Sequence, residues 1–127
     1  MKKGPLAEAQ VVQCLREHGW PHAERRVMGG RNDRGDVAGI PGVVIEVKNS
    51  PDYVRELAGW VDEAKAEGRN LAHGPNGHCV VVGTCSCEWR PAVVWHKRRG
   101  KGDPLDWYVT MTGRGFLALL AEYTREA

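Results

Sequence analysis

The sequence predicts an α/β fold, with a single mixed central β-sheet flanked by helices. Three observations predict it. Segments with helical periodicity stand near the start, in the middle and at the end of the chain. Runs rich in β-branched residues lie between them and are typical of strands. The length of 127 residues suits one domain, covering residues 1–127, and is too short for two ordinary domains.

The composition is that of a globular protein with little net charge. Hydrophobic residues make up 42% and charged residues 27% of the chain, which argues against a disordered protein. Eighteen Lys and Arg against sixteen Asp and Glu leave a net charge of +2, which excludes a histone-like polycation. No apolar window approaches the roughly 18 residues of a membrane span, and no apolar signal core follows the basic start. We therefore expect a cytoplasmic protein whose four cysteines are reduced thiols.

The first helix is expected over residues 6–18, with Pro5 in its first turn and Gly19 just past its end. Glu8 falls inside the apolar arc of this helix, where a carboxylate facing the core requires a reason. Two reasons remain open: the favourable interaction of a carboxylate with a helix N-terminus, and a functional site beneath the helix. The apolar arc comprises Ala7, Val11, Val12, Cys14 and Leu15.

Three short strands are expected next, at residues 23–28, 36–40 and 43–48. A Gly-rich loop at 29–35 separates the first two, and a Pro41-Gly42 turn folds the third strand back on the second. Side chains alternate between the two faces of a strand. This alternation places Val44, Glu46 and Lys48 on one face of the third strand, and Val43, Ile45 and Val47 on the other.

The second half of the chain is expected to contain a helix at about 52–67, strands at 78–83, 90–96 and 107–111, and a closing helix at 113–126. Loops are expected at 68–77 and 97–103. The middle helix has an apolar face that includes Leu57, Trp60, Val61 and Ala64, and its opposite face is expected to carry Arg55, Glu56, Asp62, Glu63 and Glu67. The closing helix is expected to pack through Phe116, Leu119, Leu120 and Tyr123.

Two carboxylates and a lysine are brought together by the Pro-Gly turn. Asp36 begins one strand and comes near Glu46 on the next. Two carboxylates with an adjacent carbonyl, that of Val47, suit a hard divalent cation such as Mg²⁺. Lys48 points to the same side as Glu46, where an ammonium can orient a metal-bound water and offset charge on a phosphate. The alternative is a solvated strand face with an ordinary ion pair.

Asp36 and the triplet Glu46-Val47-Lys48 on neighbouring strands resemble the site of the PD-(D/E)XK nuclease superfamily, which has the restriction-endonuclease-like fold. About residues 6–66 are most similar to the archaeal and phage Holliday junction resolvases of that superfamily. Those proteins have a first helix with an inward Glu, a Gly-Trp or Gly-Phe break, a basic strand and a Gly- and Arg-rich loop before the Asp. The corresponding residues are Glu8, Gly19-Trp20, Arg25-Arg26 and Gly29-Gly30-Arg31.

The resemblance implies a Mg²⁺- or Mn²⁺-dependent endonuclease that hydrolyses DNA phosphodiester bonds at branched substrates such as Holliday junctions. It implies that Asp36, Glu46 and the Val47 carbonyl hold the metal and that Lys48 serves the attacking water. Glu8 would complete the acidic cluster, either directly or through a water molecule. Two symmetric cuts imply a homodimer. A restriction, repair or nicking endonuclease, or a non-catalytic DNA-binding domain of the same fold, are the alternatives.

Basic residues in two stretches are the candidates for contacts with DNA phosphates. A solvated loop is the alternative interpretation for residues 97–101, and charge balance is the alternative for the arginines of the Gly-rich loop. The candidates are Arg25, Arg26, Arg31 and Arg34 in the first stretch, and Lys97, Arg98, Arg99 and Lys101 in the second.

The sequence departs from the superfamily pattern at two positions. Gly35 precedes the Asp where Pro is common, and the helix after Lys48 has no Gln, for which Glu63 is a weak substitute. Asp33 is the alternative to Asp36 as the second carboxylate, although it lies in the loop. Three further cysteines have a spacing that differs from that of zinc fingers, so ordinary thiols are favoured over a zinc site for Cys79, Cys85 and Cys87.

Overall fold

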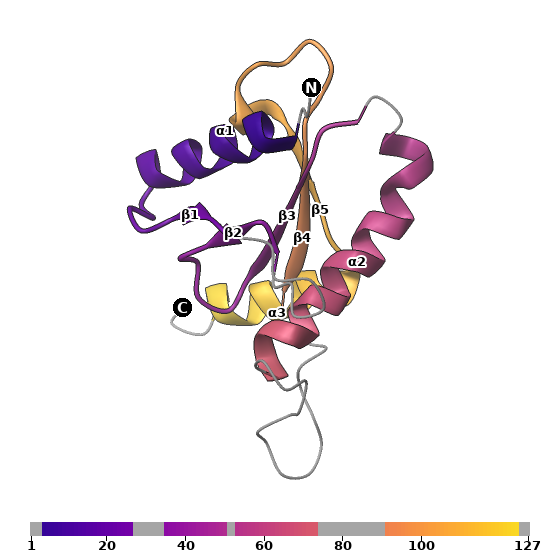
Figure 1. Ribbon diagram of the computed structural model, residues 1–127. Helices are drawn as coiled ribbons and strands as arrows, with labels where there is room; N and C mark the ends of the chain where they lie inside the picture. Colours follow the sequence, from indigo (N-terminus) through magenta and orange to yellow (C-terminus); the bar gives the residue numbers. More distant parts are fainter. Residues whose placement is uncertain (1–3, 27–34, 51–52, 74–90, 125–127) are drawn as a thin grey trace, which may run out of the picture.

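Two helices cover opposite faces of the central strands in the computed structural model (Figure 1). The structure describes residues 4–26, 35–50, 53–73 and 91–124. Within them the order is α1 (Gly4–Glu17), β1 (Glu24–Arg25), β2 (Val37–Ala38), β3 (Val44–Lys48), α2 (Tyr53–His73), β4 (Ala92–His96), a 3-10 helix (Pro104–Asp106), β5 (Tyr108–Thr110) and α3 (Gly113–Thr124). The predicted mixed α/β class is confirmed.

The described strands form two small sheets where one was expected. β3 pairs in parallel with β4, and β4 pairs antiparallel with β5. β1 and β2 form a separate antiparallel pair. A backbone hydrogen bond of 2.9 Å from the Asp36 amide to the Ile45 carbonyl links this pair to β3. β2 has only two residues, so its pairing with β3 stops after this contact instead of continuing as a hairpin.

The core has two parts, one on each face of β3 and β4. Ile45 and Val47 pack beneath α1, and Val44 packs beneath α2, as the alternation along the third predicted strand requires. Trp60 and Ala64 are the α2 residues buried against this second face. The apolar arc of α1 is buried as expected, with Ala7, Val11, Val12, Cys14 and Leu15 all in the core. β3 is therefore buried on both sides, and any polar side chain on it has little access to water.

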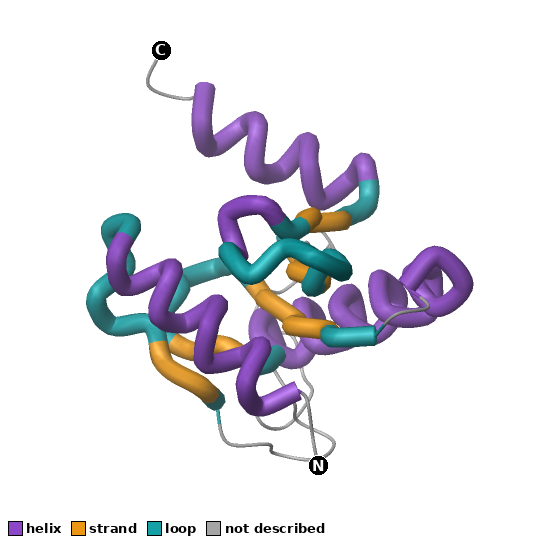
Figure 2. Tube along the Cα trace, turned by 90° about the horizontal axis from the view of Figure 1, so that it is seen from above, coloured by secondary structure: helices purple, strands orange, loops and turns teal. Residues whose placement is uncertain are grey.

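Two helices differ from their expected form. α2 continues to His73, so residues 68–73, which were expected in a loop, are helical. A single glycine, Gly68, costs only about 1 kcal/mol inside a helix, and the residues that follow it are helix-compatible. α3 lies to one side of the other elements when viewed from above (Figure 2), and Gly115 is its buried residue. Of the four residues expected to pack, Leu119 is half-buried, whereas Phe116, Leu120 and Tyr123 are exposed.

Several expected elements lie outside the described residues: the strand at 78–83, most of the loop at 29–35, and the last residues of the closing helix. Within the described part, none of the helices combines the length and the apolar character needed to cross a membrane.

Gly39 fixes the chain between β2 and β3, and its replacement should destabilise the fold. Its φ of +90° is unfavourable for any side chain, and a Cβ there would collide with the backbone carbonyl of His22. We expect Gly39→Ala to lower the free energy of unfolding by about 2 kcal/mol, measured by urea denaturation. Gly59→Ala is the matched control. Gly59 lies in α2 with open space around its Cβ position, so this change should be neutral or stabilising.

Candidate functional site

The structure brings Asp36 directly against β3. Its Oδ2 accepts a 2.7 Å hydrogen bond from the backbone amide of Val47, and the side chain is buried. The approach depends on Gly35, whose φ is +99°. A Cβ at this position would lie 2.9 Å from Val44 Cγ1 and 3.1 Å from the Ile45 carbonyl oxygen. Gly35 thus permits the close contact between the chain carrying Asp36 and β3.

Glu46 is a carboxylate in the interior of the protein, only 3% exposed. Its Oε1 is buried and accepts no hydrogen bond from an N–H or hydroxyl group of the residues that the structure describes, and its neighbours are the carboxyl groups of Glu67 and Glu63, with which it can share a proton. Burial, followed by the nearby carboxyl groups of Glu67, Glu63 and Asp36, raises the pKa of Glu46 from 4.5 to about 11. A buried acid surrounded by other acids is unstable as an anion unless a cation joins it. Glu46 therefore marks a position where positive charge would be stabilising.

Lys48 supplies part of that charge. Its Nζ lies 3.4 Å from Glu46 Oε2 and 2.9 Å from Glu63 Oε1. Burial alone would lower the pKa of Lys48, but the hydrogen bond to Glu63 and the charge of Glu46 outweigh it and raise the pKa. The same contacts with Glu46 and Lys48 outweigh burial at Glu63 and lower its pKa. The sequence-predicted pair Glu46 and Lys48 thus shares one face of β3, and the lysine remains a cation.

α2 contributes two acids that were expected on its opposite face, and for Glu67 that expectation is wrong. Glu67 is 5% exposed, and oxygens of Glu46, Glu63 and Glu67 lie within 4.8 Å of one another. The physical reason is helical periodicity, since Glu67 follows the buried Ala64 by three residues and continues the stripe that faces the sheet. That spacing was the sequence signal that could have placed Glu67 in the site. Glu63 lies at the edge of the stripe, with its side chain 46% exposed.

His96 is a further polar residue of this face that the sequence did not single out. It pairs in register with Lys48 and is 2% exposed. Its Nε2 lies 2.8 Å from Thr110 Oγ1, and its ring lies between the rings of Trp60 and Tyr108. Burial lowers the pKa of His96 and favours the neutral imidazole. The alternation along β4, in which His96 follows the buried Ala92 and Val94 on one face, could have indicated this position.

Glu8 lies on α1 and contacts β1. Its Oε1 accepts a 3.1 Å hydrogen bond from Arg25 Nε, with side chains 19% and 49% exposed respectively. The three carboxylates that converge come from β3 and α2, so Glu8 is not a member of that group. Arg26 is half-buried, and its Nη2 donates a 3.4 Å hydrogen bond to the Val37 carbonyl. These arginines therefore hold α1, β1 and β2 together.

The basic segment 97–101 begins beside the acidic face. The backbone amide of Lys97 donates a 2.9 Å hydrogen bond to the Lys48 carbonyl. The Lys97 ammonium lies 5.6 Å from the centre of the Trp107 ring, and the Arg98 guanidinium lies 4.3 Å from that of Tyr108. Arg99 and Lys101 are exposed. Arg31, Arg34, Asp33, Cys79, Cys85 and Cys87 lie outside the described residues.

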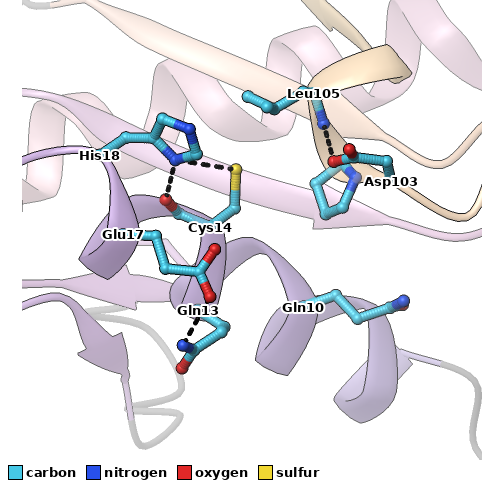
Figure 3. A pocket seen from close by; sticks show the side chains of 8 residues that line it. Gln10, Gln13, Cys14, Glu17, His18, Asp103 and Leu105 are labelled. Atoms are coloured by element: carbon cyan, nitrogen blue, oxygen red, sulfur yellow. Dashed lines mark hydrogen bonds between the residues drawn. The ribbon is translucent and has the colours of Figure 1, made fainter.

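A polar pocket of about 280 Å³ lies elsewhere, between α1 and the segment that follows β4 (Figure 3). Its cysteine and histidine do not form a nucleophile and base. Nδ1 of His18 lies 2.6 Å from the Cys14 carbonyl oxygen and 3.8 Å from the Cys14 sulfur. Burial, with the charges of Asp103 and Glu17, raises the pKa of the Cys14 thiol and keeps it protonated. The acidic face between β3 and α2 is therefore the stronger candidate site.

Comparisons with protein-family models, with curated proteins and with solved structures found no match for this chain. The geometry of the site combines buried carboxylates, which are ligands for hard divalent cations, with a charged lysine on the same strand.

Proposed function

We propose that this protein is a Mg²⁺- or Mn²⁺-dependent DNA endonuclease that cuts branched DNA such as four-way junctions. One observation carries the proposal: Asp36 and Glu46 are both buried beside β3, and the Lys48 ammonium lies 3.4 Å from Glu46. Carboxylates of this kind can hold a divalent cation, and an ammonium beside them can offset charge on a phosphate, which is chemistry that supports metal-assisted hydrolysis of a phosphodiester. The restriction-endonuclease-like fold and the resolvase-like substrate are part of the same proposal.

The residues present fit a divalent cation. Glu46 Oε1 is buried and receives no N–H or hydroxyl donor in the described part of the chain, and oxygen ligands of this kind suit Mg²⁺. Asp36, Glu46 and the Val47 carbonyl would hold the ion, which supplies Lewis-acid activation of water and offsets charge on the phosphate. The amide of Val47 fixes the orientation of the Asp36 carboxylate. Lys48 positions the attacking water and stabilises negative charge on the scissile phosphate.

The surface next to the site suits a DNA backbone. The segment at 97–101 starts one hydrogen bond away from Lys48 and carries four cationic side chains. Phosphate contacts from Lys and Arg supply most of the sequence-independent affinity for DNA. Cutting two strands of a four-way junction symmetrically requires two active sites, so we propose a homodimer as the working form.

The test is cleavage of a synthetic four-way junction beside a linear duplex of matched sequence, each with Mg²⁺ and with Mn²⁺. The proposal predicts paired, symmetric nicks in the junction and slower cutting of the duplex. Equal cutting of both substrates would support a less specific restriction-, repair- or nicking-type nuclease. If junctions, flaps and duplexes all stay intact with either metal, the catalytic proposal is wrong and binding without cleavage indicates a DNA-binding domain.

A further inference from the structure

The face between β3 and α2 contains more carboxylate than the proposed reaction uses. Oxygens of Glu46, Glu63 and Glu67 lie within 4.8 Å of one another, and of these three glutamates the proposed reaction uses only Glu46 as a metal ligand. The geometry points to a divalent-cation site held by these three glutamates, so that α2 supplies two metal ligands to the centre on β3. This inference rests on the proposed function for its catalytic meaning.

The second observation, independent of the clustering, is the state of Glu46. Its side chain is 4% exposed, and its Oε1 is cut off from water and faces carboxyl groups, with no N–H or hydroxyl donor from the described residues. An unsatisfied buried carboxylate oxygen costs several kcal/mol unless a donor or a cation reaches it. A cation bound between the strand and the helix would satisfy this oxygen and the neighbouring carboxylates together.

Charge balance favours a divalent ion. Lys48 is the cation already in contact with the group, at 3.4 Å from Glu46 and 2.9 Å from Glu63. With all three carboxylates ionised, the group together with Lys48 has a formal charge of −2, which one divalent cation neutralises. Binding of that cation to Glu63 would also release Lys48 from its shorter contact, so that the ammonium can turn toward a bound phosphate.

The dimensions suit oxygen-liganded ions. Two oxygens on opposite sides of Mg²⁺ are about 4.2 Å apart, and around Ca²⁺ about 5 Å apart. Among three octahedral ligands at most one pair is opposite, and the other pairs are about 3 Å apart around Mg²⁺, so the carboxylate oxygens, all within 4.8 Å of one another, would draw together on binding. The side chain of Glu63 is half-exposed, so a cation can reach the site from solvent at this residue. Glu46 and Glu67 are both buried and would offer no such route.

Direct titration of the metal-free protein with Mn²⁺, followed by the electron paramagnetic resonance signal of the free ion, tests the inference without DNA. We expect Glu67→Gln and Glu63→Gln each to weaken Mn²⁺ binding by at least about tenfold, since even the outer partners of metal ligands often contribute that much. Asp62→Asn is the matched control, because Asp62 is an exposed acid of the same helix. It should bind Mn²⁺ as the wild-type protein does.

Two further variants separate this site from the proposed nuclease function. The Asp36→Asn variant should not cleave DNA but should still bind Mn²⁺. Adding Glu67→Gln to this variant should weaken its Mn²⁺ binding. If the wild-type protein cuts junctions while both α2 variants bind Mn²⁺ normally, the α2 site is wrong and the nuclease proposal stands. If Mn²⁺ binding depends on Glu67 but no DNA is cut, the site stands and the nuclease proposal fails. Thermal melts in EDTA confirm that each variant is folded.

Discussion

Replacing Lys48 with alanine should lower the rate of junction cleavage by about a thousandfold, while junction binding stays within a few-fold of wild type. The Lys48 ammonium is the charged donor held next to Glu46, at 3.4 Å, on the strand that carries the proposed metal ligands. Its removal takes away the group that positions the water and offsets the developing phosphate charge. It leaves the basic segment at 97–101, and hence most phosphate contacts, in place.

The control is Lys65→Ala, which removes one lysine from an exposed position on α2 and keeps the net charge equal to that of Lys48→Ala. Single-turnover rates with saturating enzyme separate chemistry from binding, and gel-shift titrations in Ca²⁺ measure affinity. Full cleavage by Lys48→Ala would remove the lysine from the proposed mechanism. An equal loss of activity in Lys65→Ala would show that the slower cleavage results from the lost positive charge of the protein and not from the position of Lys48 beside Glu46.

The part of the site that could be predicted from sequence is the part that local rules determine. Period-two alternation on a β-branched strand was enough to place Glu46 and Lys48 on one face. The Pro-Gly turn was enough to bring Asp36 near that strand, and the hydrogen bond to the Val47 amide agrees with it. The same rules predicted the buried arc of α1. In each case the relevant neighbours are close in sequence, so their arrangement follows from backbone periodicity.

The remainder of the site depends on how α2 docks on the sheet. α2 is an amphipathic helix with an apolar stripe. The stripe would continue at Glu67, and the sequence alone favours a solvent-exposed position for this acid. Glu67 is buried because the stripe defined by Trp60 and Ala64 fixes the rotation of the helix for its whole length. His96 is buried for a similar reason, through pairing of β4 with β3. Both positions are decided by tertiary packing and not by residue preference.

Removing the ionisable group of Glu46 should stabilise the metal-free protein at neutral and alkaline pH. Burial first, and the surrounding carboxyl groups second, raise the pKa of Glu46 from 4.5 to about 11. Below pH 4.5 the folded and unfolded chains both hold this proton, so it does not affect stability. Above it the unfolded chain releases the proton and the folded chain retains it, so the free energy of unfolding falls as pH rises, by up to about 1.4 kcal/mol per pH unit.

Glu46→Gln keeps the shape of the side chain and removes the titration. We therefore expect the variant, in EDTA, to be more stable than wild type by up to about 5 kcal/mol at pH 8, with the difference growing steadily from about pH 5 to pH 9. Urea denaturation across this range measures it. Glu56→Gln, at an exposed site in the first turn of α2, is the control and should follow the wild-type curve.

Since saturating Mg²⁺ would bind the wild-type carboxylate and not the amide, the metal should reduce the difference in stability between Glu46→Gln and wild type. A constant difference across the pH range would contradict the assignment of a buried, protonated Glu46, and an unchanged difference with Mg²⁺ would contradict its role as a metal ligand.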